Sequence, residues 1–155
     1  MLERDAWSAL ESWKKGSQKK ALLIRGARQI GKTTLVREFA RRNYDCFAEI
    51  NFLAEPDAAS LFEGSLDADS LVTGLTAYLR KPLIPGKTLV LFDEVQECPA
   101  ARTAIKFLVE DGRFDYVETG SLLGVKNNVV ASYPVGFEEP LQMYPLNFKE
   151  FCQAN

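Results

Sequence analysis

One short segment constrains the fold of this chain more than any other. Residues 26–33 read Gly-Ala-Arg-Gln-Ile-Gly-Lys-Thr and match the pattern G-x-x-x-x-G-K-[ST]. In this pattern the backbone N–H groups turn inward around phosphate oxygens, the lysine reaches the β- and γ-phosphates, and the Ser/Thr hydroxyl ligates Mg²⁺. A strand precedes such a loop and a helix follows it. The segment therefore predicts a local fold together with a phosphate ligand.

The sequence on both sides of the loop agrees with that prediction. The residues from Ala21 to Ile24 form a short apolar run, as a buried parallel strand does. From Thr33 to Arg42 the apolar residues recur at helical spacing and fall on one face. A Gly-rich turn with a solvated lysine is the alternative, which this order of strand, loop and helix disfavours. The residues assigned to nucleotide binding are Gly26, Ala27, Arg28, Gln29, Ile30, Gly31, Lys32, Thr33 and Thr34.

A pair of carboxylates follows a second apolar run. Residues 88–92 read as a strand and are followed directly by Asp93 and Glu94. Open α/β sheets hold their ligands at the carboxyl ends of their strands. We therefore assign Asp93, together with Thr33, to the Mg²⁺ that bridges the phosphate oxygens of ATP. We assign Glu94 to the polarisation of a water for in-line attack on the γ-phosphorus. For both carboxylates a solvated strand end or a helix cap is the alternative.

Composition narrows the class of protein. The chain has 155 residues, which suits one domain that buries about 68–70% of its unfolded surface. Its net charge of −2 gives no global field toward nucleic acid or membrane, and the absence of histidine excludes His-based catalysis. Three cysteines without C-x-x-C spacing favour a reducing cytoplasm, and no apolar run approaches the roughly 18 residues of a membrane span. We expect a cytoplasmic domain with no direct contact to nucleic acid or membrane.

The remaining elements alternate between helix and strand. Periodicity predicts an N-terminal helix over residues 2–15, before a nucleotide-binding core over residues 19–155. Further strands are expected at residues 46–51, 88–92, 114–119 and 141–144, and helices at residues 57–62, 66–79 and 99–111. This alternation predicts an α/β fold, the three-layer sandwich of P-loop NTPases with a mostly parallel five-stranded sheet. The acid pair follows a different strand from the one that precedes the phosphate loop. This arrangement suits the branch of P-loop NTPases that has an additional strand in the sheet and uses a catalytic glutamate.

Two features near the N-terminus lie outside these motifs. Residues 14–20 contain four lysines, but this segment enters the first strand whereas the phosphate loop leaves it. We therefore place the lysines at the opposite edge of the sheet, as a solvated face, with a weak nucleic-acid contact as the alternative. Trp7 lies off the apolar stripe of the first helix, and we expect it to pack on a neighbour rather than flank an adenine.

Taken together, the motifs resemble a known family, the prokaryotic AAA-superfamily ATPases that carry a second, poorly characterised C-terminal domain. The matching segments are residues 26–35, Asp93–Gln96 with Pro99, and residues 119–124, 132–136 and 144–151. The resemblance implies a cytoplasmic ATP-binding module with ATP hydrolysis as its expected activity. It implies catalytic roles for Lys32 at the phosphates, for Glu94 as the base, and for Ser121, or Thr119, as a polar sensor of the γ-phosphate or the attacking water. A helix N-cap is the alternative for Ser121.

The chain departs from the family at two places. Phe137 stands where such families often have Arg or Lys, so this segment offers no charge-neutralising finger, and Arg102 and Arg113 are the remaining candidates. The chain also ends at Asn155, where family members continue into a helical lid and the second domain, so we expect this sequence to lack both. A protein partner or the additional domain is therefore expected, and a finger donated by another subunit would require an oligomer.

Three functions follow from these observations. The first is an ATPase that converts ATP to ADP and phosphate, slowly in isolation. The second is a nucleotide-dependent switch without significant turnover, which a missing finger favours because such an arginine contributes about 10³–10⁵-fold in related systems. The third is the ATPase part of a nucleic-acid-associated regulator whose binding domain is missing.

Overall fold

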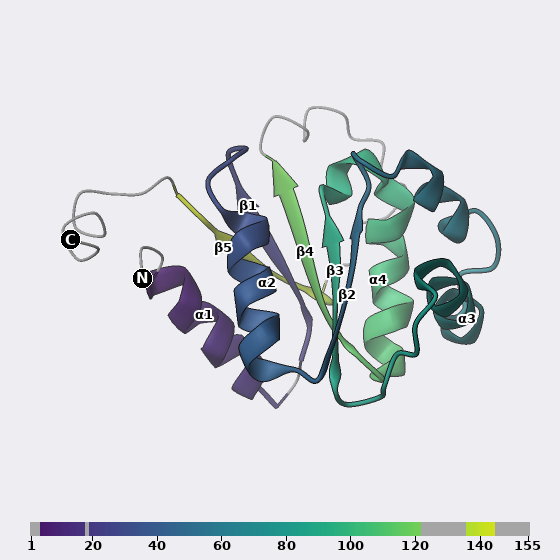
Figure 1. The fold of residues 1–155 in the computed structure, drawn as a ribbon, viewed down its shortest axis with the longest axis horizontal. Coiled ribbons are helices and arrows are strands. Elements are labelled where there is room, and N and C mark those ends of the chain that lie inside the picture. The colour runs from purple at the N-terminus through teal and green to yellow at the C-terminus, as the bar shows by residue number, and fades with distance from the viewer. Residues whose placement is uncertain (1–3, 18, 122–135, 145–155) are drawn as a thin grey trace.

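In a computed structural model of the chain, a five-stranded sheet lies between two layers of helices (Figure 1). The structure describes residues 4–17, 19–121 and 136–144. In chain order the elements are α1 (Arg4–Lys15), β1 (Ala21–Gly26), α2 (Lys32–Asn43), β2 (Cys46–Asn51), the 3₁₀ helix η1 (Pro56–Phe62), α3 (Ala68–Leu79), β3 (Thr88–Asp93), the 3₁₀ helix η2 (Val95–Glu97), α4 (Pro99–Asp111), β4 (Asp115–Ser121) and β5 (Glu138–Gln142).

The strand order places β4 between the loop strand and the acid-pair strand. The order is β2-β3-β4-β1-β5, and each neighbouring pair is parallel. The predicted α/β sandwich with a five-stranded parallel sheet is therefore confirmed, and so is the additional strand. Because all strands run the same way, the carboxyl ends of β1, β2, β3 and β4 meet at one edge, where the phosphate loop begins.

Each face of the sheet has its own core. Helices α1 and α2 cover one face, where Leu22 and Ile24 of β1 pack against apolar residues such as Phe39, and helices α3 and α4 cover the other face, where Leu23 packs. This alternation follows from the two-residue period of a strand. All six residues of β3 are buried, as expected for a strand covered on both faces, so Asp93 ends a fully buried strand.

Some predicted boundaries were wrong. The fifth strand is Glu138–Gln142 rather than residues 141–144, because its pairing with β1 starts at Glu138 and Ala21. The apolar signal at 141–144 marks only the point where the chain enters the core at Met143, whereas Glu139 and Pro140 are exposed. Helix α3 starts at Ala68 instead of Leu66, because the Asp67 side chain caps it by accepting from Ser70 N at 2.9 Å.

The N-terminal helix packs on α2. The ring of Trp7 lies edge-on to that of Phe39 with centroids 5.4 Å apart, which confirms the packing role predicted for Trp7. Trp13 is buried, and its indole Nε1 donates to the backbone oxygen of Lys20 at 2.7 Å, which fixes the end of α1 against the start of β1. Residues 2 and 3 of the predicted helix lie outside the described residues.

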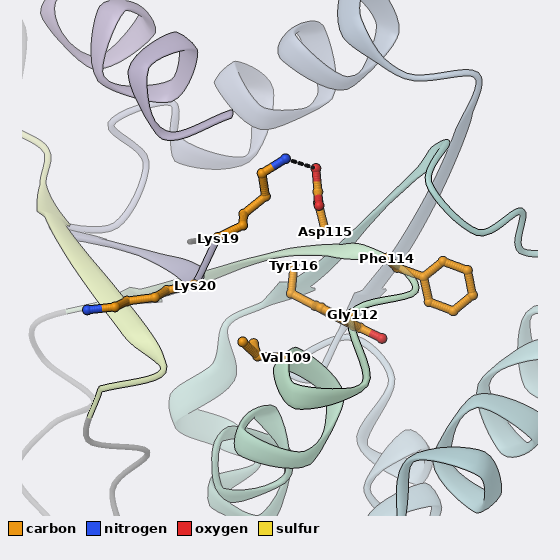
Figure 2. A pocket seen from close by; sticks show the side chains of 7 residues that line it. All are labelled: Lys19, Lys20, Val109, Gly112, Phe114, Asp115 and Tyr116. Carbon is orange, nitrogen blue, oxygen red and sulfur yellow. Dashed lines mark hydrogen bonds and ion pairs between the residues drawn. The ribbon is translucent and has the colours of Figure 1, made fainter. Parts of the chain in front are cut away.

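The lysine-rich segment lies at the edge of the sheet opposite the phosphate loop. Lys19 Nζ is 3.0 Å from Asp115 Oδ2, and Asp115 is the first residue of β4 (Figure 2). Lys20 is exposed and points away from that ion pair in the same view. Both lysines line a small pocket at the amino ends of β1 and β4, together with Tyr116 and Gly112. The interpretation of this segment as remote from the phosphates is therefore confirmed.

A buried carboxyl group lies on the α4 face of the sheet. Glu118 on β4 has no exposed surface, and burial raises the pKa of its carboxyl well above the usual range. The neighbouring carboxyl of Glu138 raises this pKa further, while Arg102 lowers it. Arg102 Nη2 pairs with Glu138 Oε1 at 2.9 Å and thereby ties α4 to β5. Glu118 thus keeps its proton in the folded state over a pH range in which an exposed glutamate loses it.

Glu118→Gln should make the fold more stable at alkaline pH. Above the ordinary glutamate pKa of 4.5 the folded state binds more protons than the unfolded chain, so stability falls as pH rises toward the raised pKa. Glutamine stays neutral and removes this loss. We expect the variant to melt about 2–4 °C higher near pH 8, which corresponds to about 1 kcal/mol in a chain of this size, and little change near pH 4. If the melting temperatures of the two proteins changed with pH in the same way, the conclusion that Glu118 keeps its proton in the folded state would be refuted.

Candidate functional site

The phosphate loop connects the end of β1 to the start of α2. Gly31 immediately precedes α2 with φ of 93°, a left-handed conformation that glycine adopts without penalty, and its oxygen accepts the first helical bond from Leu35 N at 2.9 Å. Gly26 has no room for a side chain, since an added Cβ would lie 2.5 Å from the backbone oxygen of Met143 and 2.6 Å from Ile30 Cδ1. Turn geometry thus requires glycine at position 31, and the crossing of the chain after β5 requires it at position 26.

Gly26→Ala is predicted to destabilise the fold and distort the loop. Its nearest obstacle is backbone, and Met143 is itself held by a 2.7 Å bond from its N–H to Arg25 O, so it cannot move aside cheaply. We expect a loss of about 1–3 kcal/mol, typical of overpacking, together with weaker ATP binding. Gly64→Ala is the matched control, because a Cβ there meets nothing within 4 Å. Equal denaturant midpoints for the two variants would contradict the prediction.

Lys32 is the first residue of α2, and its side chain folds back over the loop. The residue is only 5% exposed, and Nζ donates to Ala27 O at 2.6 Å and to Gly26 O at 3.1 Å. Burial lowers the pKa of this ammonium, while the charges of Glu94 and Asp93 raise it. The side chain therefore places a buried positive charge at the loop, within the field of both carboxylates.

Asp93 collects donors from three elements around the end of β3. Thr33 Oγ1 on α2 lies 2.9 Å from each carboxylate oxygen, Asn51 Nδ2 at the end of β2 donates at 3.1 Å, and the Thr119 hydroxyl on β4 donates to Oδ1. Asn51 is fixed by accepting at Oδ1 from two backbone N–H groups of the following turn, at 2.9 and 3.0 Å. The predicted association of Thr33 with Asp93 is thus present, although 60 positions separate them.

These oxygens suit a magnesium ion. A hydroxyl and a carboxylate are hard donors, and Mg²⁺ is usually bound by one or two carboxylates together with substrate phosphates and water. No group of three or more Asp, Glu, Cys or His side chains suited to a metal occurs among the residues that the structure describes. The donor set of Thr33 and Asp93 therefore fits a metal that arrives with a phosphate ligand.

Glu94 occupies a strained turn directly after β3. Its φ of 57° and ψ of 49° are left-handed, which is uncommon outside glycine and costs about 1–2 kcal/mol. Its N–H donates to the Thr119 hydroxyl at 3.1 Å, and its carboxylate Oε2 accepts from Gln96 Nε2 at 2.5 Å. The half-buried carboxylate is therefore held in a defined orientation and is not a solvated strand end.

The two sensor candidates enter the site differently. The hydroxyl of Thr119 donates to the Asp93 carboxylate and accepts from the backbone N–H of Glu94, so it contacts both residues of the acid pair. Ser121 is buried as the last residue of β4, and its backbone N–H donates to Gln96 Oε1 at 3.3 Å. The helix N-cap alternative for Ser121 depends on residues after 121, which lie outside the described residues.

Sequence reasoning missed Asn51 and Gln96. A signal for Asn51 was available, since it is a polar residue at the carboxyl end of a predicted strand, and it pairs in register with Asp93. Gln96 was noted only as the end of the matching segment Asp93–Gln96, and its role could not be assigned because it depends on how the turn after Glu94 folds onto the end of β4.

The candidates for a charge-neutralising arginine are engaged elsewhere. Arg102 pairs with Glu138 at 2.9 Å, and Arg113 pairs with Asp69 at 2.6 Å and Asp111 at 2.8 Å. Position 137 lies at the end of β1 that is opposite the phosphate loop. Phe137 O accepts from Ala21 N at 2.9 Å at the amino end of β1, so a basic residue there would start from the edge opposite the phosphate loop of its own chain. The presence of Phe137 in place of Arg or Lys therefore takes no charge-neutralising residue away from the phosphate loop of the same subunit.

Comparison with known proteins identifies related sequences and folds. Residues 18–152 match a family described as "AAA domain". No curated protein matches the chain. Among solved structures, a variant of Thermotoga maritima RuvB is similar, with 18% sequence identity and a TM-score of 0.53 over 97% of this chain and 47% of that one. The chain thus spans about half the length of that protein and shares the P-loop NTPase fold. No helix in the described ranges is long and apolar enough to cross a membrane.

Proposed function

Since the chain belongs to the AAA domain family that matches residues 18–152, we propose that this P-loop ATPase domain binds ATP at residues 26–34 and hydrolyses it to ADP and phosphate. The observation that carries the proposal is the contact between the loop and the acid pair. Thr33 Oγ1 lies 2.9 Å from both carboxylate oxygens of Asp93, so one bound ligand can contact both residues. A glycine-rich turn that only bound a phosphate would not require a carboxylate within hydrogen-bond distance of its threonine.

Binding uses the loop and its lysine. The backbone N–H groups of residues 26–34 surround the phosphates, and Lys32 exchanges the carbonyls of Gly26 and Ala27 for phosphate oxygens. Thr33 and Asp93 would hold Mg²⁺, which when bound neutralises charge on the phosphate oxygens. The Asn51 and Thr119 bonds keep the Asp93 carboxylate oriented for that task.

Glu94 acts as the base in the proposed hydrolysis. A water oxygen attacks the γ-phosphorus, the bond from that phosphorus to the β–γ bridging oxygen breaks, and ADP leaves with the bonding electrons. The proton of the attacking water passes to the Glu94 carboxylate and from there to solvent or phosphate. Lys32 offsets the negative charge during the transfer. Ser121, or Thr119, at the end of β4 would supply the polar group that senses the γ-phosphate.

Turnover by the single chain is expected to be slow. Ion pairs within the chain engage both Arg102 and Arg113, so a charge-neutralising arginine would come from a second subunit, a protein partner or an additional domain. The same observation favours the alternative of a nucleotide-dependent switch, in which binding persists and hydrolysis waits for that partner.

Equilibrium binding tests the proposed ligand. Titration of the purified chain with a fluorescent ATP analogue, competed by unlabelled ATP and ADP, should show saturable binding that strengthens with Mg²⁺. Thr33→Val should keep metal-independent binding and lose the gain from Mg²⁺, because it removes the hydroxyl beside Asp93. No displacement by either nucleotide, with or without Mg²⁺, would contradict the proposal.

A further inference from the structure

The side-chain amide of Gln96 uses both of its ends at the acid pair. Its Nε2 donates to Glu94 Oε2 at 2.5 Å, and its Oε1 accepts from the backbone N–H of Ser121 at 3.3 Å. Gln96 lies in η2, two residues after Glu94, whereas Ser121 is 25 positions further along the chain at the end of β4. One side chain therefore connects the proposed base to the strand that carries both sensor candidates.

The chemistry of the three groups fixes the direction of this bridge. A backbone N–H is a donor only, so the Gln96 oxygen must face Ser121. The NH₂ group then faces Glu94 and donates to its Oε2. Aspartate or glutamate at position 96 would present a second negative charge to Glu94, and an apolar residue would offer neither bond. Among common side chains of this length, an amide alone satisfies both partners.

The backbone around the bridge leaves room for it. A Cβ added to Gly120 would lie 3.6 Å from Gln96 Oε1 and 3.9 Å from Val95 Cγ1, so the turn after Glu94 packs directly on the end of β4. Thr119 ties the same turn through the Glu94 N–H at 3.1 Å. Thr119 therefore holds the Glu94 backbone, and Gln96 holds the Glu94 carboxylate.

We propose that Gln96 is a positioning residue that holds the Glu94 carboxylate toward the end of β4, where the attacking water is activated. The inference rests on the proposed function of Glu94 as the base. Gln96 contacts neither the loop nor the Thr33–Asp93 pair in these bonds, so it acts on turnover through Glu94 and not on nucleotide binding.

Single-turnover hydrolysis with excess protein tests the proposal. Gln96→Leu, which has a side chain of similar volume but can form neither bond, should lower the rate of ATP cleavage about 10- to 100-fold, as expected for a misplaced catalytic group. ATP affinity should stay within about twofold. In a Glu94→Gln background, Gln96→Leu should cause no further loss, because its effect passes through that carboxylate. An unchanged or faster rate, a matching loss of affinity, or an additional loss in the Glu94→Gln background would each overturn it.

A spectroscopic readout covers the case of immeasurable turnover. In a ¹⁵N-labelled chain, the Nε2 resonance of Gln96 is the one missing from the Gln96→Leu spectrum. We expect this amide pair to shift and to lose protection from solvent exchange when Glu94 is replaced by Ala, and an unaffected resonance would overturn the contact. The Glu94→Gln rate tests the role of Glu94 as the base, since an unchanged rate there removes the base while leaving the amide contact of Gln96 to be judged by its resonance.

Discussion

Lys32→Ala is expected to abolish ATP binding. The Lys32 ammonium is buried and donates to two backbone carbonyls of the loop, at 2.6 and 3.1 Å from Ala27 O and Gly26 O. Truncation of a buried, hydrogen-bonded charge at a binding site costs about 2–5 kcal/mol, so we expect a loss of ~30-fold or more in affinity. Competition against a fluorescent nucleotide measures it directly.

Lys20→Ala is the matched control for this variant. Lys20 is an exposed lysine of the segment at the opposite edge of the sheet, so its removal changes the net charge equally but leaves the loop intact. Its ATP affinity should equal that of the unmodified chain. If Lys32→Ala also bound ATP with unchanged affinity, the assignment of residues 26–34 to the phosphates would be wrong.

Glu94→Gln should separate binding from chemistry. The amide keeps the shape of the side chain but cannot accept a proton, and general-base catalysis typically contributes about 10²–10⁴-fold. We expect the variant to co-elute with intact ATP in gel filtration, while the unmodified chain accumulates bound ADP over the same time. Affinity for ATP should change little, because Glu94 makes no contact with Thr33 or Lys32 in the bonds described above.

Glu97→Gln provides the control for charge and location. Glu97 ends η2 and is exposed three residues from Glu94, so its replacement removes a nearby carboxylate without touching the proposed base. It should hydrolyse ATP like the unmodified chain. Equal hydrolysis by Glu94→Gln and Glu97→Gln would exclude Glu94 as the base.

The phosphate loop and the acid pair were predictable because each is local. A loop between one strand and one helix, or a carboxylate at the end of an apolar run, is encoded in fewer than ten consecutive residues. The meeting of Thr33 with Asp93 was also predictable, since parallel strands present their carboxyl ends at one edge. For the same reason the lysines of residues 14–20 could be excluded from the phosphates.

The parts that were missed depend on contacts between distant segments. Thr119 was predicted only as a possible sensor, and it contacts Asp93 because β4 lies beside β3 in the sheet. Gln96 contacts Ser121 only because η2 packs on the end of β4. The edge strand β5 begins with polar residues and buries few side chains. Its sequence therefore has no alternating apolar pattern from which a strand could be predicted. Strand order and register, which the sequence encodes only through the whole core, decide these features.

Steady-state phosphate release from Mg·ATP, measured for the purified chain and for Glu94→Gln side by side, decides whether hydrolysis depends on the acid pair. We expect slow turnover in the unmodified chain that falls at least about 100-fold in the variant, because one site combines the phosphate loop with the Glu94 base. Equal release by the two proteins would contradict it, since the chemistry would then not pass through the acid pair beside the loop.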